Sequence, residues 1–565
     1  MSIKISDIGS VRTLVETAIQ KGVCDVVLSP GSRNAPLIIS FTAIDAFDCI
    51  SVVDERTAGF MALGMAQQTG KPAILSCTSG SALLNYGPAI AEAYHQRIPL
   101  IVIAADRPKE WIGQGEGQSI DQLNVLQGVL QETYELVKES GEDDVWYNRR
   151  QAQFAFETAI KRSRPVLINV PMAEPLYRTT LWSMNESSIS SQCVNSDQFI
   201  GDDLLANLKE KWASCSKIMI LVAQHQPDSN LTQQLKIVYE DPRVAVLTET
   251  SANLYHFGFV SCIDRTLEMV KISDQSMFVP DLLITIGSNL ISKKLKAFLR
   301  ANKDGINEHW HIGPEMLDTF QSLTHWIDAD PAKAIAQVRL ATTEIESDFS
   351  VRWKGAFFKA EQRHMEFLQT APYSDLKVFE QILELLPVGW SLQMGNSSVV
   401  RYIQLFNQLQ GVSYFGNRGV SGIEGCTSTA VGAALKSDKP VLFISGDHAF
   451  RYDANGLSFE SLPDNLKVIV INNDGGNIFR IIDGPQNQAS GEEFIEHTQH
   501  KSVQKLVEYH GVEYRFADDL ISLDKELLEL VDSTSENCRV LEVFTPREKS
   551  PDILKSYFNF ISNEN

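Results

Sequence analysis

The sequence predicts an α/β protein made of three doubly wound, mostly parallel sheets. Apolar runs of strand length recur along the 565 residues, and many are continuous rather than alternating. Continuous runs are typical of strands covered on both faces, as in parallel sheets flanked by helices. Most runs end in glycine-, serine- or charge-rich loops, and such loops bind ligands at the carboxyl ends of parallel strands. We therefore predict α/β domains over residues 1–180, 199–345 and 371–565.

The first predicted domain alternates strand-like and helical segments. Its apolar runs lie at residues 26–28, 73–75, 100–103 and 166–171. Helical segments are expected between them, for example at residues 55–68 and 83–95. A polar, serine-rich stretch at about residues 180–197 is expected to be a linker to the second domain.

The middle third repeats the α/β pattern, with apolar runs at residues 218–222, 244–247, 282–287 and 309–312. Its first run is followed by residues 223–227, which lack a glycine-rich fingerprint, so no bound dinucleotide is expected there. His309 and His311, with His325 further on, could suggest zinc. We favour a structural role because no cysteine or acidic residue stands at ligand spacing.

The last third begins with a charged helical stretch at residues 344–370. Strand-like runs follow at residues 411–415, 440–445, 468–471 and 539–544. The loop at residues 417–425 is glycine-rich and joins a strand to a helix, which suits a diphosphate or the close approach of a ligand. It lacks the G-x-G-x-x-G spacing of a dinucleotide loop.

Two segments of this last third carry a divalent-metal signature. Gly446 and Asp447 follow one apolar run, and Asn473 and Gly475 follow the next. Mg²⁺ prefers oxygen ligands, and the Asp447 carboxylate, the Asn473 amide and the Gly475 carbonyl meet that preference. Glycines at 475 and 476 also let backbone N–H groups approach phosphate closely. Each segment alone would more often be a turn, but the two together favour a metal site.

Glu55 opens an alanine- and glycine-rich helix. Alone, it is most simply an acidic residue facing the helix dipole. Together with the metal signature, it resembles the thiamine diphosphate enzymes, in which one domain binds the cofactor's diphosphate and another activates its pyrimidine ring. The resemblance implies that Glu55 is catalytic and hydrogen-bonds the pyrimidine nitrogen in a dry pocket. It also implies that Ile423 wedges between the two rings, although a core isoleucine is an equal alternative.

The same resemblance implies a fold of the thiamine diphosphate-enzyme type, with a pyrimidine-binding first domain, a central domain and a diphosphate-binding last domain. The cofactors would be thiamine diphosphate and Mg²⁺ or Mn²⁺. The metal ligands would be Asp447, Asn473 and Gly475. The cofactor-binding residues would be Glu55, Thr78, Ser79, Gly80, Gly395, Asn396, Ser397, Ser421, Gly422, Ile423, Gly446, Asp447, Asn473, Gly475, Gly476, Ile478 and Phe479.

Within that family, the resemblance is to enzymes of menaquinone biosynthesis that decarboxylate 2-oxoglutarate and add a succinyl-semialdehyde carbanion equivalent to isochorismate. It covers essentially the whole chain and rests on residues 29–37, 54–56, 78–82, 105–108, 395–397 with Arg401, and 417–419. Both substrates are anions, which explains recurrent arginine at these motifs. The implied substrate-binding residues are Ser32, Arg33, Arg107, Gln118, Lys293, Lys294, Ser397, Arg401, Arg418, Phe479 and Ile482.

Three positions depart from the family pattern. His448 follows Asp447 where many thiamine diphosphate enzymes have glycine, and it is expected to face away from the metal. Gly117 precedes Gln118 where relatives often carry asparagine, which removes one possible substrate contact. Lys294 stands where arginine is common, so a bidentate contact becomes a point charge.

The composition indicates which partners and which cellular compartment to expect. A net charge of −21 argues against nucleic acid or an anionic membrane as partner. Eight scattered cysteines without a CxxC pair, no signal peptide and no apolar run of spanning length predict a cytoplasmic protein. The resemblance implies a homodimer or homotetramer with sites between subunits. Two alternatives stay open: another thiamine diphosphate enzyme, such as a 2-oxo acid decarboxylase or acetolactate-type synthase, and a catalytically silent sensor.

Overall fold

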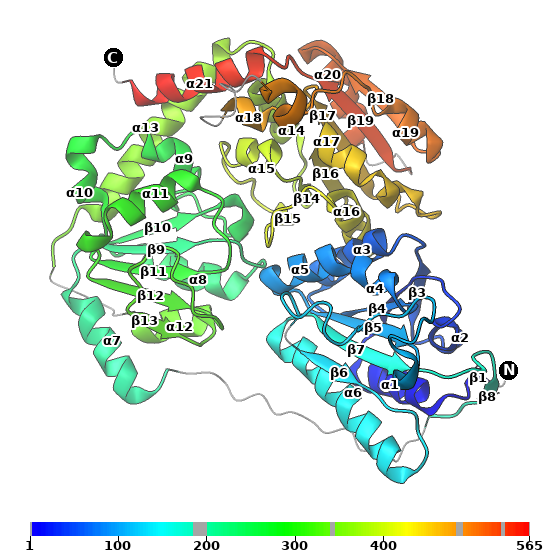
Figure 1. Cartoon of the computed structure of the whole chain (residues 1–565). Coiled ribbons are helices and arrows are strands. Elements are labelled where there is room, and N and C mark those ends of the chain that lie inside the picture. Colours follow the sequence, from blue (N-terminus) through cyan, green and yellow to red (C-terminus); the bar gives the residue numbers. More distant parts are fainter. Residues whose placement is uncertain are drawn as a thin grey trace.

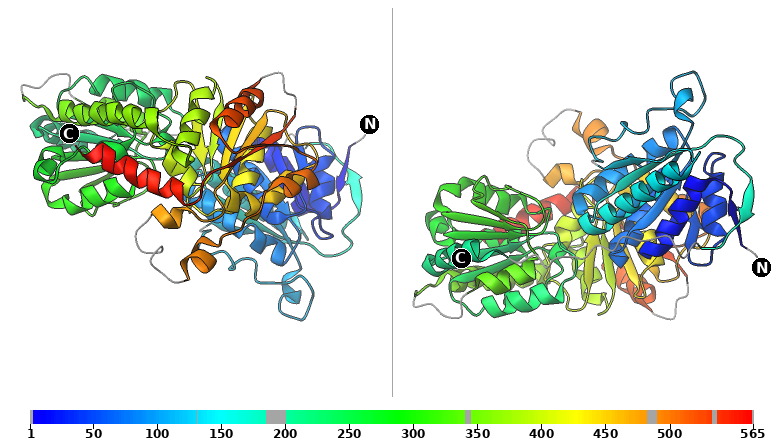
Figure 2. Two further views of the ribbon diagram at one scale, coloured as in Figure 1. Left: turned by 90° about the horizontal axis from the view of Figure 1, so that it is seen from above. Right: turned by 90° about the horizontal axis from the view of Figure 1, so that it is seen from below.

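We describe a computed structural model of the chain, which covers residues 3–130, 132–184, 200–339, 345–481, 490–532 and 537–563. It contains three parallel sheets and a short antiparallel pair, β1 (Lys4–Ser6) with β8 (Thr179–Leu181). In Figure 1 the sheets lie in three lobes, with the first third of the chain at lower right, the middle third at left and the last third at upper right. Figure 2 shows helices on both sides of the strands in the green middle lobe. The predicted class, α/β with three mostly parallel sheets, is confirmed.

The first lobe holds a sheet of six parallel strands. Its strands are β2 (Asp25–Leu28), β3 (Asp48–Ser51), β4 (Ala73–Cys77), β5 (Leu100–Asp106), β6 (Thr133–Glu135) and β7 (Val166–Pro171), in the order β3-β2-β4-β5-β7-β6. Its helices are α1 (Gly9–Lys21), α2 (Ala35–Thr42), α3 (Glu55–Thr69), α4 (Ser81–Asn85), α5 (Gly87–Gln96), η1 (Lys109–Trp111) and α6 (Glu142–Arg162). Every residue of β4 and β5 is buried, as their continuous apolar runs predict.

The middle lobe holds five parallel strands: β9 (Ile218–Val222), β10 (Val244–Thr248), β11 (Leu282–Ile286), β12 (Glu308–Ile312) and β13 (His325–Ile327). Their order is β10-β9-β11-β12-β13. Its helices are α7 (Asp202–Ser214), α8 (Ser229–Val238), η2 (Thr250–Ala252), α9 (Ile263–Leu267), η3 (Ile272–Asp274), α10 (Gln275–Phe278), α11 (Lys293–Ala301), η4 (Lys303–Gly305) and α12 (Pro331–Val338). The long helix α13 (Phe349–Thr370) leads from this lobe to the last one.

The last lobe repeats the strand order of the first. Its strands are β14 (Ser391–Met394), β15 (Ser413–Gly416), β16 (Val441–Gly446), β17 (Leu466–Asn472), β18 (Glu513–Ala517) and β19 (Arg539–Phe544), in the order β15-β14-β16-β17-β19-β18. Its helical segments are α14 (Asp375–Leu385), α15 (Ser398–Ile403), α16 (Cys426–Leu435), α17 (Asp447–Tyr452), η5 (Ala454–Ser458), α18 (Ile478–Ile481), η7 (Gly491–Glu496), α19 (Gln504–Tyr509), α20 (Leu520–Val531) and α21 (Lys549–Ser562). The shared order explains the α/β rhythm that the outer thirds of the sequence have in common.

Several predicted boundaries are corrected. The helix expected at residues 83–95 is two helices, α4 and α5, because Pro88 lies in the first turn of α5 and cannot continue the preceding helix. The strand expected from residue 411 begins at Ser413, since Gly411 has a φ of +79° that no strand adopts. The helix expected from residue 344 is α13, which begins at Phe349. Of the expected linker, residues 180 and 181 belong to β8, and residues 185–197 lie outside the described part of the chain.

The first and last lobes pack together through α3 and α16, which lie side by side in Figure 1. A Cβ at Gly64 would lie 2.0 Å from the Thr429 carbonyl oxygen, and one at Gly432 would lie 2.0 Å from the Met61 carbonyl oxygen. Only glycine permits backbones this close. Buried side chains of both lobes form one apolar cluster around this contact. Among the described helices, none combines the length and apolarity that crossing a membrane requires.

Candidate functional site

The predicted metal ligands meet at the carboxyl edge of the last sheet. Strands β16 and β17 pair in parallel with Gly446 opposite Ile471, so the residues that follow each strand are neighbours. Asp447, Asn473 and Gly475 line one cavity of about 180 Å³. The same cavity is lined by the predicted cofactor residues Asn396, Ser397, Ile423, Gly446, Gly476, Ile478 and Phe479. The structure therefore brings most of the predicted diphosphate and metal residues together.

Electrostatics at this edge suit a cation. Asp447 is buried, and burial raises the pKa of its carboxyl to about 7, although the Arg451 guanidinium 2.7 Å away lowers it. Asn473 donates its side-chain N–H to Asp375 Oδ2 at 3.0 Å, so its amide oxygen is left for another partner. Burial also raises the pKa of Asp375, which Thr545 and Asn473 partly offset by donating to it. Carboxylate and amide oxygens of this kind could hold a divalent cation.

The loops around the cavity are strained in a way that is typical of ligand sites. Ser397, Ser421 and Asp474 have φ values of +70°, +67° and +61°, where side chains other than glycine rarely lie. Gly475 has a φ of +140°, which suits glycine alone. Each of these residues follows a strand of the same sheet. Such conformations persist only where the surroundings hold them, and they cluster at ligand sites.

Unpartnered polar atoms provide a test of whether the cavity fits a polar group. Asn477 is buried and lines the cavity, and both polar atoms of its side chain lack a hydrogen-bond partner among the described residues. His448 also lines the cavity, and its buried Nε2 is likewise unpaired within the described residues. Buried polar groups are nearly always hydrogen-bonded, so the cavity fits a polar ligand such as a metal-bound diphosphate. The expectation that His448 faces away from the metal stays a prediction, although His448 lines the same cavity as Asp447.

Two of the predicted cationic residues are tied to cavity-lining residues. Arg418 donates from Nη1 to Asn396 Oδ1 at 2.7 Å, and Arg401 donates from Nη1 to the Ser397 carbonyl at 2.8 Å. Burial lowers the pKa of both guanidiniums. The positive charge of Arg401 lowers the pKa of Arg418 further, whereas the negative charge of Asp264 raises the pKa of Arg401. Among the described residues, each of these guanidiniums donates the one hydrogen bond given above, and a guanidinium carries five N–H donors, which leaves donors for an anion.

Lys293 and Lys294 open α11, at the carboxyl edge of the middle sheet. This turn is held by Glu249, a buried carboxylate that accepts the backbone amides of Ile291 at 2.7 Å and Ser292 at 2.6 Å. Burial raises the pKa of Glu249 to about 7, and the backbone hydrogen bonds oppose that shift. The Lys294 ammonium pairs with Glu268 and lies 3.6 Å from the Phe558 ring centroid, so its charge is already engaged.

Glu55 lies at the carboxyl edge of the first sheet. It is the first residue of α3, half-buried, and its Oε2 lies 3.5 Å from the Asn85 side-chain nitrogen. Asp54 caps this helix by accepting the amides of Arg56 and Thr57. The predicted residues Thr78, Ser79 and Gly80 follow β4 at the same edge, and Gly80 has a φ of +88°.

The remaining predicted substrate residues gather near them. Burial lowers the pKa of Arg33, and the neighbouring charge of Arg107 lowers it further. Arg33 donates to the Met172 carbonyl at 2.5 Å, and Arg107 donates to the Gly117 carbonyl at 2.8 Å. Gln118 has a φ of +53°, and Ser32 is exposed in the loop after β2. Each guanidinium also has a carboxylate neighbour, Glu174 at 3.8 Å from Arg33 and Glu116 at 3.2 Å from Arg107. Guanidiniums that influence each other's charge in this way favour additional anions nearby.

The predicted site thus forms two clusters within one chain. Glu55 is absent from the lining of the cavity that holds Asp447 and Asn473. The predicted residue Ile482 lies outside the described residues. Sequence reasoning missed Asp375, Asn477 and Glu249. Asp375 and Glu249 are recognised only through their partners, which lie far along the chain, whereas Asn477 follows the predicted glycine pair directly and could have been included.

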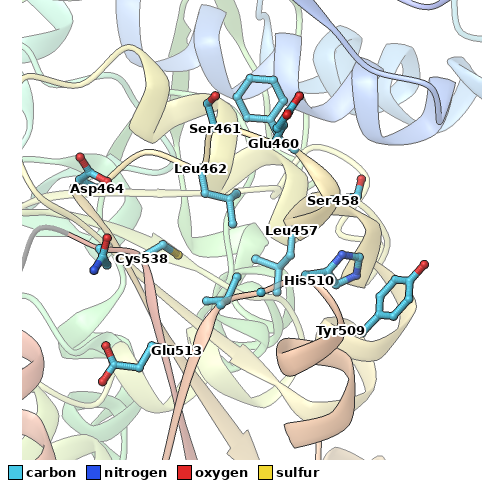
Figure 3. Close-up of a pocket in the computed structure, with 14 residues that line it drawn as sticks. Leu457, Ser458, Glu460, Ser461, Leu462, Asp464, Tyr509, His510, Glu513 and Cys538 are labelled. Atoms are coloured by element: carbon cyan, nitrogen blue, oxygen red, sulfur yellow. The ribbon is translucent and has the colours of Figure 1, made fainter.

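A second hollow of the last lobe lies at the opposite edge of its sheet. It measures about 830 Å³, and Figure 3 shows His510, Glu513 and Cys538 on its wall. Glu513 begins β18 and Cys538 precedes β19, so this hollow lies at the amino ends of the strands. Ligands of parallel α/β sheets bind at the carboxyl ends instead. The candidate site is therefore the smaller cavity beside Asp447.

The structure supports the structural role favoured for His309 and His311 over zinc binding. The Thr285 hydroxyl lies 3.0 Å from His309 Nε2 and 2.9 Å from His311 Nδ1, so each ring has a hydrogen-bond partner inside the middle sheet. Burial lowers the pKa of both imidazoles to about 4, which keeps them neutral. This arrangement supports a structural role for the pair.

Comparison with known proteins agrees with this geometry. Residues 10–125 match the family model described as "Thiamine pyrophosphate enzyme, N-terminal TPP binding domain". A 2-succinyl-5-enolpyruvyl-6-hydroxy-3-cyclohexene-1-carboxylate synthase of Flavobacterium johnsoniae is 40% identical over 553 residues, covering 97% of this chain and 98% of the relative. Synthases of the same name from Christiangramia forsetii and Porphyromonas gingivalis are 37% and 36% identical, covering 99% of this chain and 100% and 98% of the relatives. The chain belongs to the 2-succinyl-5-enolpyruvyl-6-hydroxy-3-cyclohexene-1-carboxylate synthase family of thiamine diphosphate-dependent enzymes.

Proposed function

We propose that this protein is a carboligating transferase that releases carbon dioxide from 2-oxoglutarate and adds the remaining four-carbon unit to isochorismate. The product is 2-succinyl-5-enolpyruvyl-6-hydroxy-3-cyclohexene-1-carboxylate, an intermediate of menaquinone biosynthesis. The names of its relatives support this assignment. Thiamine diphosphate, when bound, supplies the reactive carbon and accepts the electron pair left by decarboxylation.

One observation carries the substrate assignment: half-buried cations border the cofactor cavity. Arg401 and Arg418 are hydrogen-bonded to consecutive cavity-lining residues, Ser397 and Asn396. A neutral acceptor does not need two half-buried guanidiniums, whose partial desolvation is unfavourable unless an anion pairs with them. Both substrates proposed here are anionic. This favours the synthase over a decarboxylase or an acetolactate-type enzyme with small neutral acceptors.

Each cluster has a proposed task. Asp447, Asn473 and the Gly475 carbonyl would bind Mg²⁺ or Mn²⁺, and the neighbouring loop amides would bind the diphosphate. The guanidiniums and the ammonium groups of Lys293 and Lys294 would orient substrate carboxylates, and Lys294 would do so while it remains paired with Glu268. Ser32, Gln118, Ser397, Phe479 and Ile482 are proposed to complete the substrate site. Glu55 would hold a proton at the pyrimidine nitrogen in a desolvated setting.

We further propose at least a homodimer. Glu55 belongs to the first sheet, and the cavity lined by Asp447 belongs to the last sheet of the chain and does not include it. A second copy that supplies Glu55 to this cavity would complete the site. Residues 1–180, 199–345 and 371–565 would be the pyrimidine-binding, central and diphosphate-binding domains. The seven described cysteines are free thiols, which supports a cytoplasmic setting.

The reaction itself is the test. Full-length protein is incubated with thiamine diphosphate, Mg²⁺, 2-oxoglutarate and isochorismate, and carbon dioxide and the adduct are measured. The proposal expects the adduct only when isochorismate is present, with one carbon dioxide released for each adduct. Carbon dioxide release that is unchanged by isochorismate, without adduct, would identify a simple decarboxylase instead. A protein that binds the cofactor without turnover would be a sensor.

A further inference from the structure

The glycine-rich loop at residues 417–423 is held by a side chain from another lobe. Glu92 lies on α5 of the first lobe and is 2% exposed. Its Oε1 accepts the Gly419 amide at 2.5 Å, and its Oε2 accepts the amides of Val420 at 2.7 Å and Ser421 at 3.2 Å. Three consecutive N–H groups around one carboxylate form an anion-binding nest. Here the chain fills that nest with an anion of its own.

The contact is too close for any substitute at position 419. A Cβ on Gly419 would lie 2.6 Å from the Glu92 carbonyl oxygen. The loop and α5 therefore touch backbone to backbone as well as through the carboxylate. Gln96 adds a further donor, from Nε2 to Glu92 Oε1 at 2.5 Å, and itself accepts from Gln224 of the middle lobe at 3.0 Å. All three lobes thus meet at this point.

The loop needs an external support because its conformation is unfavourable. Ser421 has a φ of +67°, a backbone conformation that is unfavourable for a residue other than glycine. Charge-assisted hydrogen bonds to a buried carboxylate are among the stronger ones in proteins. The hydrogen bonds from the Val420 and Ser421 amides to Glu92 therefore stabilise the loop against that strain.

The supported loop carries proposed site residues. Arg418 immediately precedes the nest and donates to Asn396, while Asn396 donates to the Asn417 and Gly422 carbonyls at 2.7 and 2.6 Å. The loop is thus closed on itself at the cavity side and pinned by Glu92 on the opposite side. We propose that Glu92 is a positioning residue that holds residues 417–423 so that Arg418 faces substrate and Ser421–Gly422–Ile423 face the cofactor. This inference rests on the proposed function for its kinetic consequences.

Amide hydrogen exchange tests the structural half of the proposal without any turnover. The cofactor-loaded full-length protein is compared with Glu92→Ala and Glu92→Gln, using peptides that span residues 416–425. Protection of the Gly419, Val420 and Ser421 amides should fall at least about tenfold in Glu92→Ala. It should fall less in Glu92→Gln, which keeps one acceptor oxygen and nearly the same volume, and which serves as the test variant should Glu92→Ala fail to fold. Unchanged protection in Glu92→Gln and Glu92→Ala would overturn the proposal.

A double-mutant cycle tests the positioning of Arg418. Arg418→Ala should lower kcat/KM by about tenfold or more in the wild type but less than threefold in the Glu92→Ala or Glu92→Gln background, because contacting residues are not additive. Equal losses in both backgrounds would overturn the proposal. Glu16→Ala removes another buried glutamate of the first lobe and controls for general destabilisation. It should leave both the exchange at residues 419–421 and the Arg418 effect as in the wild type. If the wild type makes no adduct, the proposed function is refuted. The hydrogen-exchange result still decides whether Glu92 holds residues 419–421.

Discussion

Asn473 and Asp375, 98 residues apart in the chain, are joined by a hydrogen bond of 3.0 Å between buried side chains. Asp375 opens α14, whereas Asn473 follows β17. Since the Asn473 nitrogen donates to the carboxylate, its oxygen is turned toward other partners. Thr545 also donates to Asp375, which fixes that carboxylate in place. The hydrogen bond between Asn473 and Asp375 therefore leaves the Asn473 side-chain oxygen available to a cation.

Removing this support should weaken metal binding. Groups that orient metal ligands typically contribute 10- to 100-fold in affinity, so Asp375→Ala is expected to raise the Kd for Mn²⁺ by about that factor. Electron paramagnetic resonance titration with Mn²⁺ in the presence of thiamine diphosphate measures this without turnover. Asp464→Asn, at the opposite edge of the same sheet, is the control and should leave the Kd unchanged. Equal Kd values for Mn²⁺ in both variants would show that Asp375 does not support the metal site.

Glu55→Gln separates catalysis from helix stabilisation. If Glu55 exchanges a proton with the cofactor, turnover should fall by about 10²-fold or more, while the Kd for thiamine diphosphate changes little. A role facing the helix dipole would contribute only about 0.3–1 kcal/mol to stability and nothing to turnover. Glu142→Gln, in the first turn of α6, is the matched control for a dipole effect. Steady-state kinetics beside calorimetric cofactor titration checks the prediction, and undiminished turnover would exclude the catalytic role.

The α3–α16 contact should tolerate no added methyl group. In Gly64→Ala the new Cβ would lie 2.0 Å from the Thr429 carbonyl oxygen, so the two helices must separate. Overpacking of this kind costs about 1–3 kcal/mol or more. Gly355→Ala is a matched change inside α13, where nothing lies within 4 Å of the new Cβ, and it should stabilise by about 0.5–1 kcal/mol. Urea unfolding of both variants should therefore give shifts of opposite sign.

Buried histidines should make the protein less stable in mild acid. Burial lowers the pKa of His309 to about 4, whereas the pKa of a histidine in an unfolded chain is about 6.5. As the pH falls below 6.5, the unfolded chain binds a proton that the folded chain cannot, so the free energy of unfolding decreases. At pH 5 this amounts to about 2 kcal/mol for one such histidine.

Buried carboxyls oppose this trend, so the comparison must be between variants. Glu249, with its pKa raised to about 7, gives stability that increases as the pH falls from 7 toward its unfolded value. Between pH 6.5 and 5, the slope of the free energy of unfolding against pH should therefore differ between His309→Gln and the wild type by up to about one proton, and the variant should lose less stability, or gain more, as the pH falls. Identical slopes in His309→Gln and the wild type would contradict the assignment.

Glu249 should influence substrate affinity through α11. Its carboxylate holds the Ile291 and Ser292 amides directly before Lys293. Leaving buried amides unpaired costs about 1–3 kcal/mol, so Glu249→Ala should raise the KM of at least one anionic substrate by about tenfold. Glu308→Gln removes the charge of another carboxylate of this lobe, which is bonded to Lys211 and Thr324, and should leave both KM values within twofold. Unchanged KM values in Glu249→Ala would show that the α11 cations do not contact substrate.

Strand positions and the loops that follow them were determined by the sequence alone. The runs before Asp447 and Asn473 are buried β16 and β17, because a continuous apolar run has a local origin and needs no knowledge of distant residues. The split of the 83–95 helix at Pro88 was equally local and could have been predicted. The family membership followed from such loops as well.

Only the tertiary structure decided which distant groups support these loops. Glu92, Glu249 and Asp375 look like ordinary helix or loop carboxylates in sequence. Each becomes informative when packing buries it against backbone amides or an amide side chain from another element. The physical reason is that a buried carboxylate is stable only when donors reach it, and which donors reach it depends on how segments that are far apart in the chain pack together.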